Sequence, residues 1–343
     1  MDRHVEMRRG VRHPYAAVEG KEMIIVLLIT SVFLAMNMGV SGFSVSFAPS
    51  YGSNILNKNK AALLYGFCVI LGACLIGPRV AETLVNKISY TQLGVLSAGI
   101  ILISCAITMF LSNILKVPQS TSFVTVASFL GAGIYYGKVN WGTIGRILAF
   151  AAVFSLVAFV LTIVIKRMIY PPHESNLKFY ETFFAHRSKF KKFVIFHDMY
   201  AGFSVGTNNV ANVVAPLLIS LGGGNLFWFL IVSPLFGIGS YLWGERVIRS
   251  VSKDIIPVGE VSASIVSFIT ATFVLLASFL GLPTPYVQFT TFSLLGISCV
   301  KDGFSHTWGK SIVKRIFWVW ILVPLFTIFL SFILHTIFRV GKV

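Results

Sequence analysis

The residues best suited to bind a ligand are three asparagines inside an apolar stretch. Residues 206–216 read GTNNVANVVAP, which places Asn208, Asn209 and Asn212 between two strongly apolar runs. An amide without a partner is costly in hydrocarbon, so this cluster must face protein, water or a ligand. Two interpretations follow: a ligand site, or contacts that hold helices together, because asparagine and glycine also occur where membrane helices meet.

A second copy of the pattern favours the ligand site. A shift of 167 residues carries Gly206 onto Gly39, which opens GVSGFSVSFAPSYGS, and carries Gly244 of WGERV onto Gly77 of IGPRV. A shift of 165 residues carries LGLPTPYVQFTTFSLLG onto LKVPQSTSFVTVASFLG. Three landmarks in one order at nearly one offset indicate a duplicated unit of about 165 residues, far longer than a solenoid repeat.

The composition places most of the chain in a lipid bilayer. Hydrophobic residues make up 56% and charged residues 12%, the reverse of a water-soluble domain. Each half contains four apolar runs of about 17–25 residues, the length of a membrane-crossing helix. The expected spans are residues 23–38, 61–76, 92–111, 144–165, 194–219, 226–243, 261–280 and 316–338. We therefore expect an all-α, multi-pass protein of the plasma (inner) membrane.

The basic residues lie in the tails and polar connections. This placement explains the net charge of +16 by the cytoplasmic preference of lysine and arginine, and nucleic acid is not an expected partner. The expected units are a polar tail (1–22), a first repeat (23–169), a linker (170–192), a second repeat (193–338) and a C-terminal tail (339–343). Tail and linker are both basic, which by charge implies an even number of crossings, whereas an inverted repeat requires an odd number. The repeat is the stronger argument.

Each half is expected to contain one interrupted helix and one re-entrant hairpin. Residues 36–53 carry Gly39, Gly42, Pro49 and Gly52, so a continuous helix is not expected there. Residues 117–131 are too few to cross twice and too polar for lipid, which predicts a hairpin turning at PQSTS, and residues 280–296 repeat it. Broken helix ends attract anions, and matched breaks in two repeats indicate a transporter's central site.

Charged residues next to these segments allow two interpretations. Arg79 with Glu82, and Glu245 with Arg246, lie within one helical turn, as a structural ion pair or a relay would need. Asp198 follows His197 near the start of the span that leads to the asparagines. It could form a local pair or titrate on a transport path.

The chemistry of the four interrupted segments favours sulfate. Residues 39–53, 117–131, 206–216 and 282–296 contain no Asp or Glu. Phosphate near neutral pH still carries an O–H that a carboxylate would accept, whereas sulfate is an acceptor only and would be repelled by one. The chain shows no paired carboxylates and no nucleophile–base pair, so no enzyme, cofactor or metal site is expected.

GTNNVANVVAP, WGERV and the two proline hairpins together resemble the inorganic phosphate transporter family over residues 23–338. That family has a duplicated GANDVAN motif and a PxSTT-type turn. The resemblance implies two inverted repeats, two re-entrant hairpins and cation-coupled symport of an inorganic oxyanion. Here Asn209 and Gly42 replace the motif's two aspartates, and Val69 stands where the family usually has glutamate. These departures are similar to the bacterial sulfate permease branch, which shares the MNMG-x-SG opening, the STSxVTV turn and the PxP-x5-T hairpin.

The expected function is therefore sulfate import with protons. The alternative is symport of phosphate, or of another tetrahedral oxyanion such as thiosulfate, with protons or sodium; a homodimer is left open. The residues expected to bind the anion are Ser41, Gly42, Ser44, Ser120, Thr121, Ser122, Thr125, Thr207, Asn208, Asn209, Gln288, Thr290 and Thr291. Structural or coupling roles are expected for Asn212, Arg79, Glu82, Glu245, Arg246 and Asp198.

Overall fold

The chain folds into helices throughout the part that the computed structural model describes, residues 14–88, 93–114, 119–250 and 260–340. In chain order these are α1 (Pro14–Ser46), α2 (Ala48–Gly52), α3 (Lys58–Asn86), α4 (Val95–Ile114), α5 (Thr121–Tyr136), α6 (Trp141–Ile169), the 3₁₀ turn η1 (Glu174–Asn176), α7 (Leu177–Ala185), α8 (Arg187–Asn209), α9 (Ala211–Leu221), α10 (Asn225–Ser250), α11 (Glu260–Phe279), α12 (Tyr286–Asp302), α13 (Phe304–Gly309) and α14 (Ser311–Ile337).

Seven segments of the described helices are long and apolar enough to cross a bilayer. They are Glu22–Ser46, Lys58–Asn86, Val95–Ser112, Trp141–Ile169, Asn225–Arg249, Val261–Phe279 and Val313–Ile337. The eighth expected run, residues 194–219, is divided between α8 and α9. The prediction of an all-α membrane protein is confirmed.

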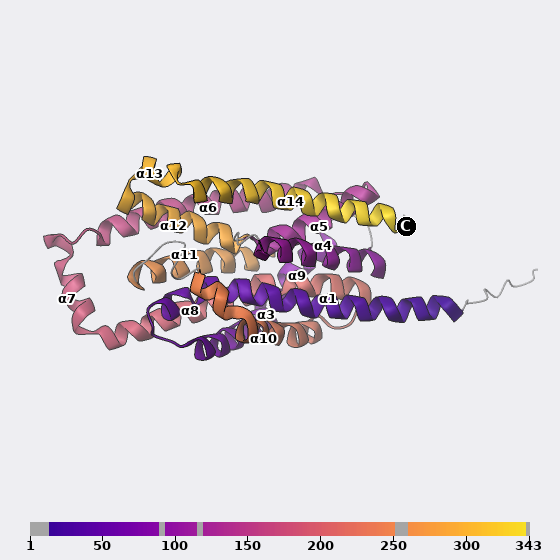
Figure 1. The fold of residues 1–343 in the computed structure, drawn as a ribbon, viewed down its shortest axis with the longest axis horizontal. Helices are drawn as coiled ribbons and strands as arrows, with labels where there is room; N and C mark the ends of the chain where they lie inside the picture. Colours follow the sequence, from indigo (N-terminus) through magenta and orange to yellow (C-terminus); the bar gives the residue numbers. More distant parts are fainter. Residues whose placement is uncertain (1–13, 89–92, 115–118, 251–259, 341–343) are drawn as a thin grey trace, which may run out of the picture.

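The long helices run along the long axis of the molecule (Figure 1). The start of α1 and the C-terminal end lie at one end, and α7 lies at the other. The Tyr135 hydroxyl donates to the Val340 carbonyl (2.8 Å) near the first end, and the Tyr180 hydroxyl donates to the Ile169 carbonyl (2.6 Å) near the second. The chain therefore passes from end to end an odd number of times between α1 and the linker.

Two helix pairs occupy opposite halves of the molecule. The α4–α5 pair lies in the half that carries the C-terminal end, and α11–α12 lies in the half that carries α7 (Figure 1). In each pair, the start of the second helix lies against Asn208. Ser122 at the start of α5 and Thr284 just before α12 both hydrogen-bond to the Asn208 side chain. The duplicated polar segments thus converge on one interior region.

Glycines bring the two halves into close contact in a reciprocal pattern. At four glycines an added Cβ would meet a carbonyl oxygen of the other half: Gly39 at Phe236, Gly206 at Val69, Gly72 at Phe203, and Gly239 at Met36. The 167-residue shift turns the first contact into the second and the third into the fourth. The packing of the two copies on each other therefore has the same symmetry as the sequence duplication.

The predicted interruption within residues 36–53 is present, but it lies after Gly39 and Gly42 rather than at them. α1 continues through these glycines to Ser46, and the break comes at Phe47, just before α2 with Pro49 in its first turn. The break in the second half is also slight, because Val210 between α8 and α9 keeps helical torsion angles (φ −64°, ψ −33°). Glycine in a membrane helix allows backbones to touch without forcing the helix to end.

Candidate functional site

The site is centred on Asn208, near the end of α8, whose amide joins three elements. Its Oδ1 accepts from the Ser122 hydroxyl and from the Thr284 main-chain N–H, both at 3.0 Å. Its Nδ2 donates to the Ser278 hydroxyl and to the Leu282 carbonyl, both at 3.0 Å. α8 is thereby fixed to the start of α5 and to the turn between α11 and α12.

These four contacts use the full hydrogen-bonding capacity of the Asn208 amide. A primary amide has two donors and two common acceptor positions, and each is occupied here. The orientation is also determined: the Thr284 N–H can only donate and the Leu282 carbonyl can only accept, so exchanging O and N would break both bonds. Asn208 would have to give up one of these bonds to donate to an anion.

Asn212 extends the same network by one helical turn. Its Nδ2 donates to the Ser122 hydroxyl (3.2 Å), while its Oδ1 is buried without a partner. Pro216 lies four residues later inside α9 and has no N–H, so the Asn212 carbonyl lacks its usual helical donor. Polar backbone is thus available next to the Asn212 side chain.

Other buried amides and hydroxyls near these turns keep unused capacity. Asn209 is 4% exposed and its Oδ1 has no partner. Gln119, which directly precedes Ser120, is 3% exposed, and neither its oxygen nor its nitrogen has a partner. The Thr284 hydroxyl is also buried without a hydrogen-bond partner. Because buried polar groups are normally paired, this concentration is typical of a binding site.

Most of the other expected donors direct their single O–H toward nearby helix carbonyls. The Oγ atoms of Ser44, Thr125, Thr290 and Thr291 donate to carbonyls three or four residues earlier. Thr207 Oγ1 lies 2.7 Å from the Ser204 carbonyl and 2.9 Å from the Ser278 hydroxyl. Ser120 caps α5 by accepting from the Phe123 N–H (3.3 Å).

The remaining expected binding residues lie on the same elements. Thr121 is buried in the first turn of α5, and Gln288 is 9% exposed in the first turn of α12. Ser41 is half-buried on α1, one residue before Gly42. A Cβ at Gly42 would meet the Tyr65 hydroxyl of α3 and Val205 of α8. The structure brings Ser122 and Asn208 together directly, and it places Gly42 against α8 and α3.

Arg79 does not pair with Glu82, and Glu245 does not pair with Arg246; three of these residues have other partners. Arg79 is exposed; it donates to the Phe279 carbonyl at the end of α11 (3.2 Å) and lies over the Phe279 ring. Glu82 pairs with Lys87 (3.1 Å). In the second half, Glu245 pairs with Arg249 (3.1 Å), four residues later, and Arg246 is exposed. These exposed charges lie on the outer surface of the bundle.

Asp198 lies in a separate buried group of hydroxyls. It is 0% exposed, its Oδ2 accepts from the Ser50 main-chain N–H (2.9 Å), and its Oδ1 has no partner. The expected pair with His197 is not formed, since the His197 ring bonds the Phe193 carbonyl and lies against the Phe193 ring. Asp198 is thus a buried carboxyl surrounded by neutral groups.

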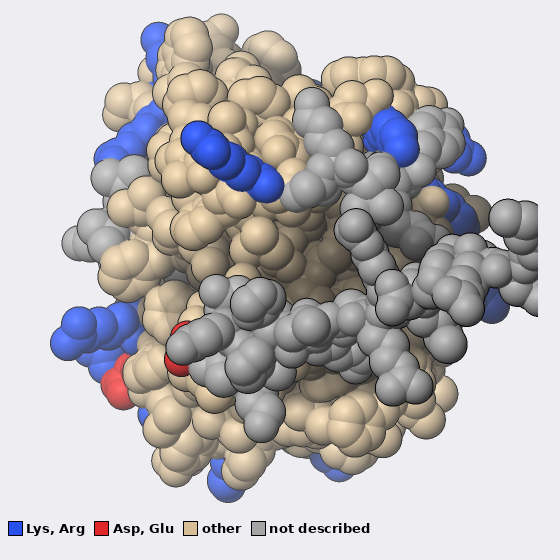
Figure 2. All heavy atoms as spheres, turned by 90° about the vertical axis from the view of Figure 1, so that its right-hand side faces the viewer, with Lys and Arg blue, Asp and Glu red and all other residues tan. Residues whose placement is uncertain are grey.

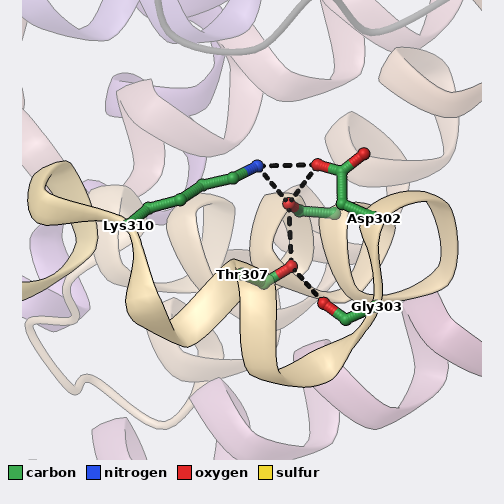
Figure 3. Close-up of polar contacts among 5 residues, drawn as sticks. Asp302, Gly303, Thr307 and Lys310 are labelled. Carbon is green, nitrogen blue, oxygen red and sulfur yellow. Dashed lines mark hydrogen bonds and ion pairs between the residues drawn. The ribbon is translucent and has the colours of Figure 1, made fainter.

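Charged side chains lie at both ends of the molecule. Near α7, Lys310 bridges the Asp302 carboxylate and the Ser298 hydroxyl, which Thr307 also contacts (Figure 3). At the opposite end, several Lys and Arg side chains are spread over the described surface, and few acids are visible (Figure 2). An excess of positive charge on a surface raises the local concentration of anions.

Sequence reasoning missed several residues of the interior network. Gln119 could have been predicted, because it belongs to the polar PQSTS segment. Ser278 could not, because it lies in an apolar run, and nothing in that run indicates its hydrogen bond with Asn208. Tyr65 and Tyr286 are likewise buried with unpartnered hydroxyls, which their place in apolar segments did not indicate.

Comparison with known proteins agrees with this architecture. The model of the phosphate transporter family matches residues 38–331. The chain is 31% identical over 326 residues to the sulfate permease CysP of Bacillus subtilis (strain 168), covering 92% of this chain and 88% of that protein. A solved structure described as the sodium-dependent phosphate transporter has the same fold, with a TM-score of 0.76, 21% identity, and coverage of 93% of this chain and 99% of that one. The chain is a multi-pass membrane transporter, not an enzyme, and it belongs to the phosphate transporter family.

Proposed function

We propose that this protein imports sulfate across the plasma membrane by proton symport. The observation that carries the proposal is the neutral character of the Asn208 region, where the side chains that hydrogen-bond to Asn208 and Asn212, those of Ser122 and Ser278, bear hydroxyls. Neutral donors suit an anion that only accepts hydrogen bonds, and a carboxylate there would repel it. The 31% identity to a protein named as a sulfate permease supports the same choice.

The proposed architecture is a pair of inverted repeats, each with a re-entrant hairpin at residues 117–131 or 280–296, the regions where α5 and α12 begin. The reciprocal glycine contacts and the placement of the α4–α5 and α11–α12 pairs in opposite halves support this arrangement. In it, α5 and α12 both begin in the interior, so the positive ends of their dipoles face the same region as Asn208. Paired breaks of this kind surround the substrate in many transporters.

Within this site the residues take different roles. Gln119 would donate to the anion through its buried, unpartnered Nε2. Asn209 would donate through Nδ2, since its unpartnered Oδ1 can only accept, and Ser120 would donate through its hydroxyl. Asn208 and Ser122 would hold the two hairpins in place through the bonds they already make. Thr121, Thr125, Gln288, Thr290 and Thr291 would close over the anion from the hairpins, and Ser41, Gly42, Ser44 and Thr207 would line it from α1 and α8.

Phosphate symport is the second candidate. The likeness in fold to a structure described as a sodium-dependent phosphate transporter favours it. Against it stand Asn209 and Gly42, which leave both copies of the family motif without the carboxylate that could accept the phosphate O–H or hold a cation.

Uptake by the purified protein in proteoliposomes tests the proposal. We expect radiolabelled sulfate to accumulate when the lumen is alkaline, without sodium, and excess phosphate to compete poorly. A sodium gradient alone should drive no accumulation. If the protein took up phosphate in response to a sodium gradient and did not transport sulfate, both the proposed substrate and the proposed coupling ion would be wrong.

A further inference from the structure

We propose that Asp198 is the residue that carries the coupled proton. This inference rests on the proposed symport and identifies the group that performs it. Asp198 is fully buried in α8, and no described Lys, Arg or His lies in ion-pair contact with it. A lone carboxylate inside a membrane protein is costly, so the stable form in this conformation carries a proton.

The surroundings of Asp198 suit a group that gains and loses a proton. Its Oδ2 is held by the Ser50 N–H, which leaves the unpartnered Oδ1 to take the proton. The Ser50 hydroxyl and the Tyr65 and Tyr286 hydroxyls are also buried without partners. Tyr286 lies within electrostatic reach of both Asp198 and Tyr65. These neutral groups could stabilise the proton or shift their hydrogens when the proton leaves.

The polar groups around Asp198 are neutral at ordinary pH. α8 packs mainly on α3, α11, α1 and α2. Ser50 of α2 bonds Asp198 directly, and Tyr286 of α12 lies within its electrostatic reach. Ser46 of α1, Thr270 of α11 and Tyr65 of α3 adjoin Tyr286 rather than Asp198 itself. Lys178 of α7 and Lys189 at the start of α8 are exposed. Thus the protonation of Asp198 is not set by a permanent local ion pair.

The position of Asp198 couples it to the proposed anion site. Asp198 and Asn209 are 11 residues apart on α8, which places them on nearly one face, about three turns and about 16 Å apart. Asp198 lies on the α7 side of Asn209. Ser50 belongs to the short α2 that follows the break after α1, so a movement of α1 or α2 against α8 would change the environment of the carboxyl. Proton release from Oδ1 would accompany that movement.

The experiment compares wild type, Asp198→Asn and Asp198→Glu in proteoliposomes, with Glu181→Gln as the control because Glu181 is exposed on α7. Two assays are read: sulfate accumulation driven by a pH gradient, and exchange of internal for external sulfate without a gradient. Asp198→Asn should lose accumulation and keep exchange, which should no longer depend on pH. Asp198→Glu should keep accumulation with a shifted pH profile, and Glu181→Gln should behave as wild type.

Gradient-driven accumulation by Asp198→Asn at the wild-type level would overturn the inference. If that variant does not fold, Asp198→Glu decides, since a pH profile identical to wild type would also overturn it. Failure of the proposed function gives a different result, because the wild-type protein would then not accumulate sulfate in response to a pH gradient. If protons drive phosphate instead, the same variants are compared with phosphate.

Discussion

At the scale of single residues, neighbouring asparagines of one motif have different tasks. Asn208 is saturated by four hydrogen bonds, whereas Asn209 is buried with an unpartnered oxygen. From the sequence, both asparagines were expected to bind the anion, because a sequence shows residue types but not hydrogen-bond partners. A buried polar residue in a transporter can therefore hold the site in shape without contacting the substrate.

This difference predicts opposite phenotypes for two alanine variants. Asn208→Ala leaves the Thr284 N–H and the Leu282 carbonyl buried without partners, so we expect a loss of about 2–5 kcal/mol in stability and a clear fall in Tm. Asn209→Ala should keep a Tm near wild type and lose sulfate uptake. Thermal unfolding in detergent, read beside uptake, measures both. A stable Asn208→Ala would contradict the structural role.

The Lys310–Asp302 contact predicts a pH dependence at the surface. Hydrogen bonds from Lys310 and Ser298 lower the pKa of Asp302 below its ordinary value of 3.8. Because the pKa of Asp302 is lower in the folded than in the unfolded state, its ionised carboxylate stabilises the fold at pH values above the unfolded-state pKa. This stabilisation is lost as the pH falls through the folded-state pKa. We expect Asp302→Asn to lower Tm slightly at neutral pH.

The Tm difference between Asp302→Asn and wild type should shrink only below about pH 4, as the ordinary aspartate pKa implies. Melting curves measured from pH 7 to pH 3 would show it. A difference that stays constant down to pH 3 would show that the carboxylate does not contribute in this way.

At the scale of helices, the positions of the elements were more predictable than their interruptions. Apolar length located the seven described helices that are long and apolar enough to cross a bilayer, because the bilayer fixes how many residues a crossing helix needs. The glycines of α1 predicted a break, which comes later, at Phe47, whereas the missing side chain of Gly39 admits the backbone of Phe236 from the other half. Sequence cannot separate these two uses of glycine, because the partner backbone lies almost 200 residues away.

Close helix contact at Gly206 leads to a sharp test of packing. A Cβ there would meet the Val69 carbonyl oxygen, so Gly206→Ala should force α8 and α3 apart and cost about 1–3 kcal/mol. Gly145 in α6 has nothing within 4 Å of an added Cβ, so Gly145→Ala should be tolerated or gain about 1 kcal/mol from helix propensity. Tm values in detergent should move in opposite directions. Equal shifts would show that Gly206 is not a contact position.

At the scale of the whole molecule, the fold settles a conflict that charge alone leaves open. Lysine and arginine in both the N-terminal tail and the linker favour the same side of the membrane for both. The structure instead places the start of α1 and the linker helix α7 at opposite ends (Figure 1). One of the two basic segments must therefore lie on the side that the charge rule disfavours. The linker is the stronger cytoplasmic signal, because its basic residues are concentrated in HRSKFKK.

This arrangement predicts the sidedness of two loops. Lys138 follows α5 at the end that carries Val340, and Lys189 lies in the first turn of α8 near α7; both are exposed. Single cysteines at these positions, in a background without Cys68, Cys74, Cys105 and Cys299, should react with a membrane-impermeant maleimide from opposite sides. In inside-out vesicles Lys189→Cys should label first, and in right-side-out vesicles Lys138→Cys should. Labelling of both from one side would require an even number of crossings between them, which is incompatible with α6 joining the two ends of this bundle.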